Sequence, residues 1–157
     1  MLNYFKIQEA IIFTTEMFKD IPAKKPTLLH SIRCGLKLMN DGFGTDLVVA
    51  GILHDVVEDT VCTLEEIEEK YGSVVREIVA VNTKNPSITD ANARREDLIR
   101  RCCEQGGDTL IVKISDIYDN HLYYCALNDT DLVQYCLELK GYIEKYLRPE
   151  DAKNVYI

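Results

Sequence analysis

One stretch constrains this chain more than any other, because an apolar run leads directly into groups that bind metals or move protons. Residues 47–53 read LVVAGIL, and His54, Asp55, Glu58 and Asp59 follow within six positions. A run this apolar is typical of a buried segment. Burying several acids is unfavourable unless a cation compensates their charge. A divalent metal that takes imidazole and carboxylate ligands supplies that compensation, so the stretch indicates a metal site.

Helical spacing would arrange these groups in pairs. Residues four apart on a continuous helix lie one above the other. His54 would then lie above Glu58, and Asp55 above Asp59. The alternative is a helix end whose acids simply face water. His-Asp alone is a weak signal, whereas HDxxED after a buried helix is much stronger, so we favour the metal site.

Composition and charge narrow the class of protein. The chain has 157 residues, of which 46% are hydrophobic and 28% charged, and this suits one globular domain over residues 1–157. We find no run of transmembrane length and no signal peptide, so we expect a cytoplasmic protein without membrane partners. The six cysteines lack CxxC or zinc-finger spacing and are expected to be reduced. The net charge of −8 argues against nucleic-acid binding, and any phosphate site would need a metal and local Lys or Arg.

Nearly every segment has helical periodicity, which predicts an all-α fold with turns at the glycines and prolines. Residues 109–114 could form a strand on propensity alone, but no partner strand is evident, so we expect helix there. Thr63 and Glu66 form a capping-box pattern. The other expected N-caps are Thr45 or Asp46, Ser73, and Asp108 or Thr109. The expected helices cover about residues 3–19, 27–39, 45 to the HDxxED motif, 63–70, 73 to the turn at 85–87, 89–104, 108–127 and 130–146.

The segment at residues 109–127 contains a second candidate ligand. Its predicted core face comprises Ile111, Ile114, Tyr118 and Cys125. A polar stripe recurs at steps of 3, 4 and 3, at Lys113, Asp116, Asn120 and Tyr123. A solvated face would produce the same stripe. Because its neighbours are apolar and a carboxylate ligand is still needed, we favour a functional Asp116, whereas His121 is interpreted as a structural or exposed histidine.

Taken in order, His30, the HDxxED motif and Asp116 resemble the HD superfamily of metal-dependent phosphohydrolases. The closer resemblance is to the hydrolase domain of RelA/SpoT enzymes and to small single-domain alarmone hydrolases. The matching stretches cover roughly residues 24–125 and read AGILHDVVEDT at 50–60, TLEEI at 63–67, YG at 71–72, NTK at 82–84 and IVKISD at 111–116, with Asn120 following. This resemblance implies a single-domain HD-type helical bundle.

The resemblance also implies roles for individual residues. One metal ion, Mn²⁺ in the alarmone hydrolases, would be bound by His30, His54, Asp55 and Asp116. Fe²⁺ or another divalent ion also suits this mixed set of imidazole and carboxylate. Glu58 and Asp59 would handle the attacking water, and Asn120 would orient a ligand or the nucleoside sugar. The implied reaction is removal of the 3′-pyrophosphate from guanosine 3′,5′-bis(diphosphate).

Two segments depart from the family pattern. The family usually has Arg-Lys-x-Gly-x-Pro-Tyr before its first histidine, whereas residues 24–29 here read KKPTLL. Lys24 and Lys25 are the expected substrate-binding cations, although lysine stacks on a purine less well than arginine. Residues 117–123 read IYDNHLY where the family often has RLHNMRT. The metal chemistry is therefore better supported than the particular nucleotide.

The expected partner is a small phosphorylated nucleotide, and three functions toward it remain open. The first is the 3′-pyrophosphohydrolase. The second is an HD-type nucleotidase for simple mono- or triphosphates, and the third is a non-catalytic HD module that senses nucleotides. Retention of all six metal and acid/base positions argues against the third. Lys84, Arg94 and Arg95 are further cations, but each is equally well interpreted as a solvated surface charge.

Overall fold

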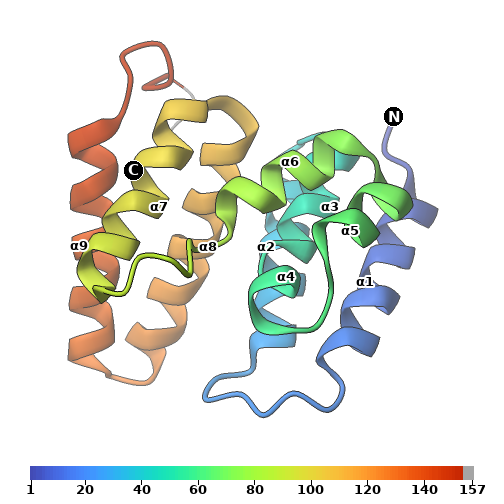
Figure 1. The fold of residues 1–157 in the computed structure, drawn as a ribbon, viewed down its shortest axis with the longest axis horizontal. Helices are drawn as coiled ribbons and strands as arrows, with labels where there is room; N and C mark the ends of the chain where they lie inside the picture. The colour runs from blue at the N-terminus through green and yellow to red at the C-terminus, as the bar shows by residue number, and fades with distance from the viewer. Residues whose placement is uncertain (154–157) are drawn as a thin grey trace. The chain divides into compact units, whose positions relative to one another are not determined.

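The computed structural model describes residues 1–153, which form helices and the turns that connect them (Figure 1). The predicted all-α fold is therefore confirmed for the described residues. The chain divides into two compact units, residues 1–83 and residues 84–157. That residues 1–157 form one hydrolase domain stays a prediction, and the two units are described separately below.

The apolar run lies at the centre of unit 1. Every residue from 47 to 53 is buried, as the sequence predicted, and α3, which contains them, packs against α1, α2 and α6. The short α4 and the pair α5 and α6 complete the unit (Figure 1). The helices of unit 1 are α1 (Tyr4–Phe18), α2 (Thr27–Asn40), α3 (Thr45–Leu53), α4 (Val56–Asp59), α5 (Leu64–Tyr71) and α6 (Ser73–Asn82).

Two glycines allow α2 and α3 to approach closely. A Cβ atom added to Gly51 would lie 2.6 Å from Leu38 Cδ1 and 3.3 Å from the Cα atom of Gly35. A Cβ atom added to Gly35 would lie 2.9 Å from the carbonyl oxygen of Val48, a backbone atom of α3. Backbone cannot move aside as the end of a side chain can. The absence of a side chain at position 35 therefore sets the separation of the two helices.

The predicted helix caps had mixed outcomes. The capping box of Thr63 and Glu66 is confirmed, with both reciprocal hydrogen bonds formed. The cap predicted for α3 is wrong, because Gly44 is the N-cap there. Thr45 instead accepts a hydrogen bond from the backbone amide of Asn3 at 2.9 Å, and the carboxylate of Asp46 pairs with Lys6 at 2.7 Å. The side chains of Thr45 and Asp46, which local reasoning assigned to capping, thus contact residues of the N-terminal segment instead.

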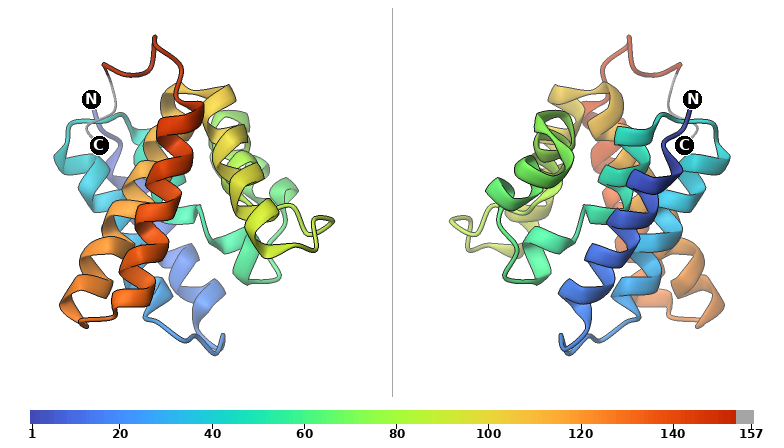
Figure 2. Two further views of the ribbon diagram at one scale, coloured as in Figure 1. Left: turned by 90° about the vertical axis from the view of Figure 1, so that its left-hand side faces the viewer. Right: turned by 90° about the vertical axis from the view of Figure 1, so that its right-hand side faces the viewer.

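In the part of unit 2 that the structure describes, residues 84–153, three long helices lie side by side: α7 (Ala91–Gln105), α8 (Gly107–Ala126) and α9 (Thr130–Tyr146) (Figures 1 and 2). The N-caps predicted for α6 and α8 are wrong, because glycines occupy these positions. At α8 the amide of Gly107 donates to Asp151, a buried residue that Arg148 also contacts. Burial alone would raise the pKa of Asp151, but the Gly107 amide and the Arg148 guanidinium hold it below its usual range. A residue 44 positions away therefore secures the start of α8.

The core face predicted for α8 is wrong. Tyr118 is 48% exposed, Cys125 is exposed, and Ile111 and Ile114 are half-buried. The helix is apolar on more than one side, so periodicity alone does not choose the buried face. The side chains of α8 that are buried include Leu110, Val112, Lys113, Ile117 and Tyr124.

The six cysteines form no disulfide, as expected, and all but Cys125 are buried. Among residues 1–153, no helix has both the length and the apolar character needed to cross a membrane.

The close packing of α2 on α3 can be tested with two glycine substitutions. We expect Gly35→Ala to lower the free energy of unfolding by about 1–3 kcal/mol, because the new methyl group overpacks the helix interface. Gly141 lies within α9, and a Cβ atom there would meet nothing within 4 Å. The matched control Gly141→Ala should raise the free energy of unfolding by about 0.5–1 kcal/mol through helix propensity alone. Denaturant titration measures both, and equal effects at the two sites would contradict the proposed role of Gly35.

Candidate metal centre

Three of the predicted ligands meet in unit 1. His30 lies in the first turn of α2, where its backbone amide donates to the carbonyl of Pro26 at 3.0 Å. His54 follows the last residue of α3, and Asp55 comes next. The histidines are only 2% and 1% exposed, whereas Asp55 is half-buried. The site thus has a buried imidazole floor and a carboxylate that reaches toward solvent.

The chain does not continue as a regular helix through the motif, which corrects the expectation of one helix. α3 ends at Leu53, His54 and Asp55 form a turn, and α4 begins at Val56. Adjacent residues on a regular helix point in different directions. In this turn the Nε2 atom of His54 lies 3.3 Å from Oδ1 of Asp55. The interruption therefore allows neighbouring residues to converge on one point.

A backbone hydrogen bond determines the tautomer of His54. Its Nδ1 atom lies 2.8 Å from the carbonyl oxygen of Gly51. A carbonyl oxygen can only accept, so Nδ1 must carry the proton. In a neutral ring the lone pair then resides on Nε2, the atom that faces Asp55. Histidines that bind metals commonly pass their other N–H to a backbone carbonyl in this way.

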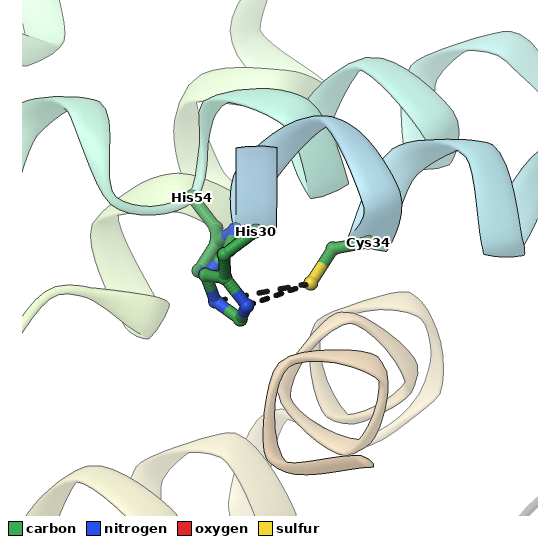
Figure 3. A group of neighbouring side chains, drawn as sticks. All are labelled: His30, Cys34 and His54. Atoms are coloured by element: carbon green, nitrogen blue, oxygen red, sulfur yellow. Dashed lines mark hydrogen bonds between the residues drawn. The ribbon is translucent and has the colours of Figure 1, made fainter. Parts of the chain in front are cut away.

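His30 completes the arrangement on the other side of Asp55. The Nε2 atom of His30 lies 3.7 Å from Oδ2 of Asp55, so each carboxylate oxygen faces one imidazole. The two rings meet edge to face, with centroids 5.3 Å apart and an interplanar angle of 73°. Figure 3 shows both rings together with Cys34, which lies one turn after His30 on α2.

These donors fit a divalent metal ion. The Nε2 lone pair of a neutral His54 ring and the carboxylate oxygen of Asp55 are both acceptors, so a cation between them makes the contact favourable. A divalent ion would serve His30, His54 and Asp55 at once. Donor atoms of His30, Cys34 and His54 all lie within 4.8 Å of one another, close enough for one ion to be held.

Cys34 is a site residue that sequence reasoning placed only on an apolar helix face. Its Sγ atom lies 3.8 Å from Nδ1 and 3.9 Å from Nε2 of His30. A sulfur atom almost equidistant from both nitrogens lies off the lone-pair axis of each. We therefore interpret Cys34 as a support that packs against the His30 ring. The i,i+4 spacing of the two residues was the signal that could have identified this contact.

The remaining residues predicted for unit 1 lie around this centre. Glu58 and Asp59 are on α4, where Glu58 is half-buried and Asp59 is exposed. Lys24 and Lys25 precede α2 in the turn after α1. Lys25 lines a largely apolar pocket of about 390 Å³ between the end of α1 and the start of α2, together with Phe18, Ile21 and Pro26 among others. Lys24 is exposed.

The predicted residues of unit 2 form a group of their own on α8. Lys113 donates to Oδ2 of Asp116 at 2.9 Å, and the Asn120 amide donates to Oδ1 at 2.7 Å. The stripe recognised in the sequence is thus a partly buried, hydrogen-bonded cluster at these three positions. That Asp116 binds the same ion as His54 stays a prediction.

Comparison with known proteins agrees with this picture. Guanosine-3′,5′-bis(diphosphate) 3′-pyrophosphohydrolase of Aquifex aeolicus is 31% identical over 119 residues, which cover 73% of this chain and 17% of the relative. The 3′-pyrophosphohydrolase MESH1 of Xenopus tropicalis is 37% identical over 95 residues, which cover 57% of this chain and 53% of the relative. This chain is homologous to the SpoT/RelA-type ppGpp hydrolases. The family resemblance seen in the sequence is therefore confirmed.

The fold of these hydrolases matches as well. A solved structure of a metazoan orthologue of SpoT that hydrolyses ppGpp superposes with a TM-score of 0.77 at 22% identity, covering 94% of this chain and 88% of that one. The predicted HD-type fold is thereby confirmed. No protein-family model matches the chain. The chain spans about half the length of the Xenopus relative and a sixth of the Aquifex relative.

The geometry of Cys34 predicts which side chains retain the ion. After loading with Mn²⁺ and dialysis, His54→Ala should lose most bound metal, because it removes a donor that the Gly51 carbonyl orients. Cys34→Ala should keep its metal, because the sulfur lies beside the His30 ring rather than on a lone-pair axis. Metal analysis by mass spectrometry compares the two variants. Loss of metal in Cys34→Ala with folding intact would make the thiol a ligand.

Proposed function

We propose that this chain is a metal-dependent phosphohydrolase that removes pyrophosphate from the 3′ position of guanosine 3′,5′-bis(diphosphate). The observation that carries the proposal is the geometry after α3, where the Gly51 carbonyl orients His54 so that its Nε2 atom and that of His30 both face Asp55. The names of the homologous Aquifex and Xenopus proteins supply the reaction and the nucleotide.

The proposed ligands are His30, His54 and Asp55 from unit 1 and Asp116 from unit 2. Mn²⁺ is the proposed ion, and the same mixture of imidazole and carboxylate also suits Fe²⁺ or another divalent ion. When bound, such an ion supplies Lewis acidity and lowers the pKa of a coordinated water. The chain's own acids then manage the proton of that water.

In the proposed reaction, the oxygen of water forms a bond to the phosphorus attached to the 3′ oxygen, and the bond between that phosphorus and the 3′ oxygen breaks. The products are GDP and pyrophosphate. Glu58, half-buried on α4, is the proposed base that accepts the proton from water. Asp59, its exposed neighbour, is proposed to orient the water, and Asn120 to contact the ribose.

The pocket beside Lys25 is the proposed site for the nucleoside. Its walls are mostly apolar and it measures about 390 Å³, which suits a flat base. Lys24 and Lys25 are proposed to hold the phosphates at its edge. Local cations are needed because a chain with a net charge of −8 repels a polyanion overall.

The direct test is product release with added Mn²⁺. The wild-type protein should release pyrophosphate from guanosine 3′,5′-bis(diphosphate). Glu58→Gln should keep its metal but turn over roughly 10²–10⁴-fold more slowly, the usual contribution of a general base. Asp55→Ala should lose both metal and activity. A wild-type rate in Glu58→Gln would remove Glu58 from the mechanism.

Other results of the same assay point to the other functions. Release of orthophosphate from simple nucleoside mono- or triphosphates, without cleavage of the bis(diphosphate), would indicate a nucleotidase. Nucleotide binding without any product release would indicate a sensing module. Either result would contradict the proposed reaction.

The role of the lysine pair predicts a salt-dependent effect. Changing Lys24 and Lys25 together to Gln should raise KM for a multiply phosphorylated nucleotide more than for a monophosphate. The difference should shrink as salt rises, because exposed charges are screened beyond roughly 8–10 Å. Steady-state kinetics at two ionic strengths measure both effects. Equal loss on both substrates would instead show that the pair supports folding or the metal site.

A further inference from the structure

Unit 2 contains a buried cation. Lys113 is 5% exposed, and no other Lys or Arg among residues 1–153 is as fully buried. Lysine is rarely buried unless it is paired, since removing the ammonium from water is costly. Its Nζ atom lies 2.9 Å from Oδ2 of Asp116, whose side chain is 14% exposed. The two charges therefore compensate each other in a poorly hydrated environment.

The pair belongs to a three-residue clamp on one face of α8. Positions 113, 116 and 120 are separated by three and four residues, so their side chains lie on the same face of the helix. Lys113 takes one carboxylate oxygen of Asp116, and Asn120 takes the other at 2.7 Å. The clamp holds the carboxylate in one orientation.

Two groups on the neighbouring helices indicate that this face is poorly hydrated. Burial raises the pKa of Cys102 on α7 to about 11, and the charge of Lys113 opposes the rise. Burial also raises the pKa of Tyr135 on α9, where Lys84, Arg95 and Lys113 oppose the rise and Asp116 adds to it. A thiol and a phenol from two different helices thus both experience the charges of the Lys113–Asp116 pair. Charges act strongly on one another where little water intervenes.

We propose that Lys113 is a positioning residue that orients Asp116 and neutralises it until a divalent ion takes its place as the compensating charge. This inference rests on the proposed function, which makes Asp116 a ligand of the ion. Lys113 then has two opposed effects on metal binding. It holds the Asp116 carboxylate in one orientation, which favours metal binding. It also competes with the ion for the negative charge of that carboxylate, which opposes metal binding.

Competition predicts the sign of the effect when the charge is removed. Lys113→Met keeps the length and apolar stem of the side chain but removes the ammonium group that lies 2.9 Å from Oδ2 of Asp116. The metal-free protein should lose stability, whereas in the metal-bound protein the ion compensates the carboxylate. The substitution therefore raises the free energy of the metal-free state more than that of the metal-bound state. As a result, Lys113→Met should bind metal more tightly than the wild-type protein. If the substitution instead damaged the site, metal binding would become weaker.

The test is a Mn²⁺ titration by calorimetry, with thermal unfolding followed in EDTA and in Mn²⁺. We expect the dissociation constant of Lys113→Met to fall at least about tenfold, equivalent to ~1.4 kcal/mol. Its Tm should fall in EDTA, and the rise in Tm on adding Mn²⁺ should exceed that of wild type. Lys113→Gln is the second variant if the Met variant does not fold without metal. Lys113→Arg keeps the charge and should stay within about twofold of wild type.

Asp116→Asn separates this inference from the function on which it rests. Asp116→Asn should weaken Mn²⁺ binding, and adding Lys113→Met to it should cause no further gain in affinity. An unchanged dissociation constant in Asp116→Asn would overturn Asp116 as a ligand and this inference with it. Weaker binding in Asp116→Asn, together with unchanged or weaker binding in Lys113→Met and Lys113→Gln, would overturn only the role of Lys113.

Discussion

The hydrogen bond from His54 Nδ1 to the Gly51 carbonyl links the chemistry of unit 1 to the backbone of its most buried helix. Gly51 is also a point where α3 meets α2, at Leu38 and Gly35. His30 lies on α2, so the separation of the two helices determines the separation of the two imidazoles. The packing of the glycines and of Leu38 between α2 and α3 thereby positions the two histidines.

This link explains why an apolar run directly precedes the motif. A ligand at the end of a helix is only as well placed as the helix itself, and burial of residues 47–53 on every side leaves α3 little freedom to move. The turn at His54 and Asp55 then directs two consecutive side chains toward the same point. Rigid packing of α3 and a local departure from helical geometry are both required to bring His54 and Asp55 together.

The all-α fold and most helix ranges could be predicted from the sequence because they depend on local periodicity and on caps such as Thr63. Two of the predictions that were wrong, the N-caps of α3 and α8, depend on distant residues. Thr45 is engaged by Asn3, and the start of α8 by Asp151. Neither partner could be identified from spacing, since the chain must fold before these residues meet.

The candidate site shows the same division between local and distant information. The HDxxED pattern predicted the types of ligand, whereas the break after Leu53 and the tautomer of His54 depend on three-dimensional geometry. Burial of Lys113 was not predicted because periodicity counts a lysine as a surface residue. Its pairing with Asp116 at i,i+3 reverses that assignment, since a compensated charge can enter an apolar face.

The two acids proposed as metal ligands are compensated in different ways, and this difference has a physical consequence. Asp55 faces two imidazoles, which can be neutral and which are themselves proposed ligands. Asp116 faces an ammonium group that cannot bind a metal while it is charged. At Asp55 an ion therefore gains three donors at once, whereas at Asp116 it must share the carboxylate with an existing cation. Affinity for the ion should accordingly arise mainly from the imidazole side, and Asp116 should determine how much of that affinity is retained.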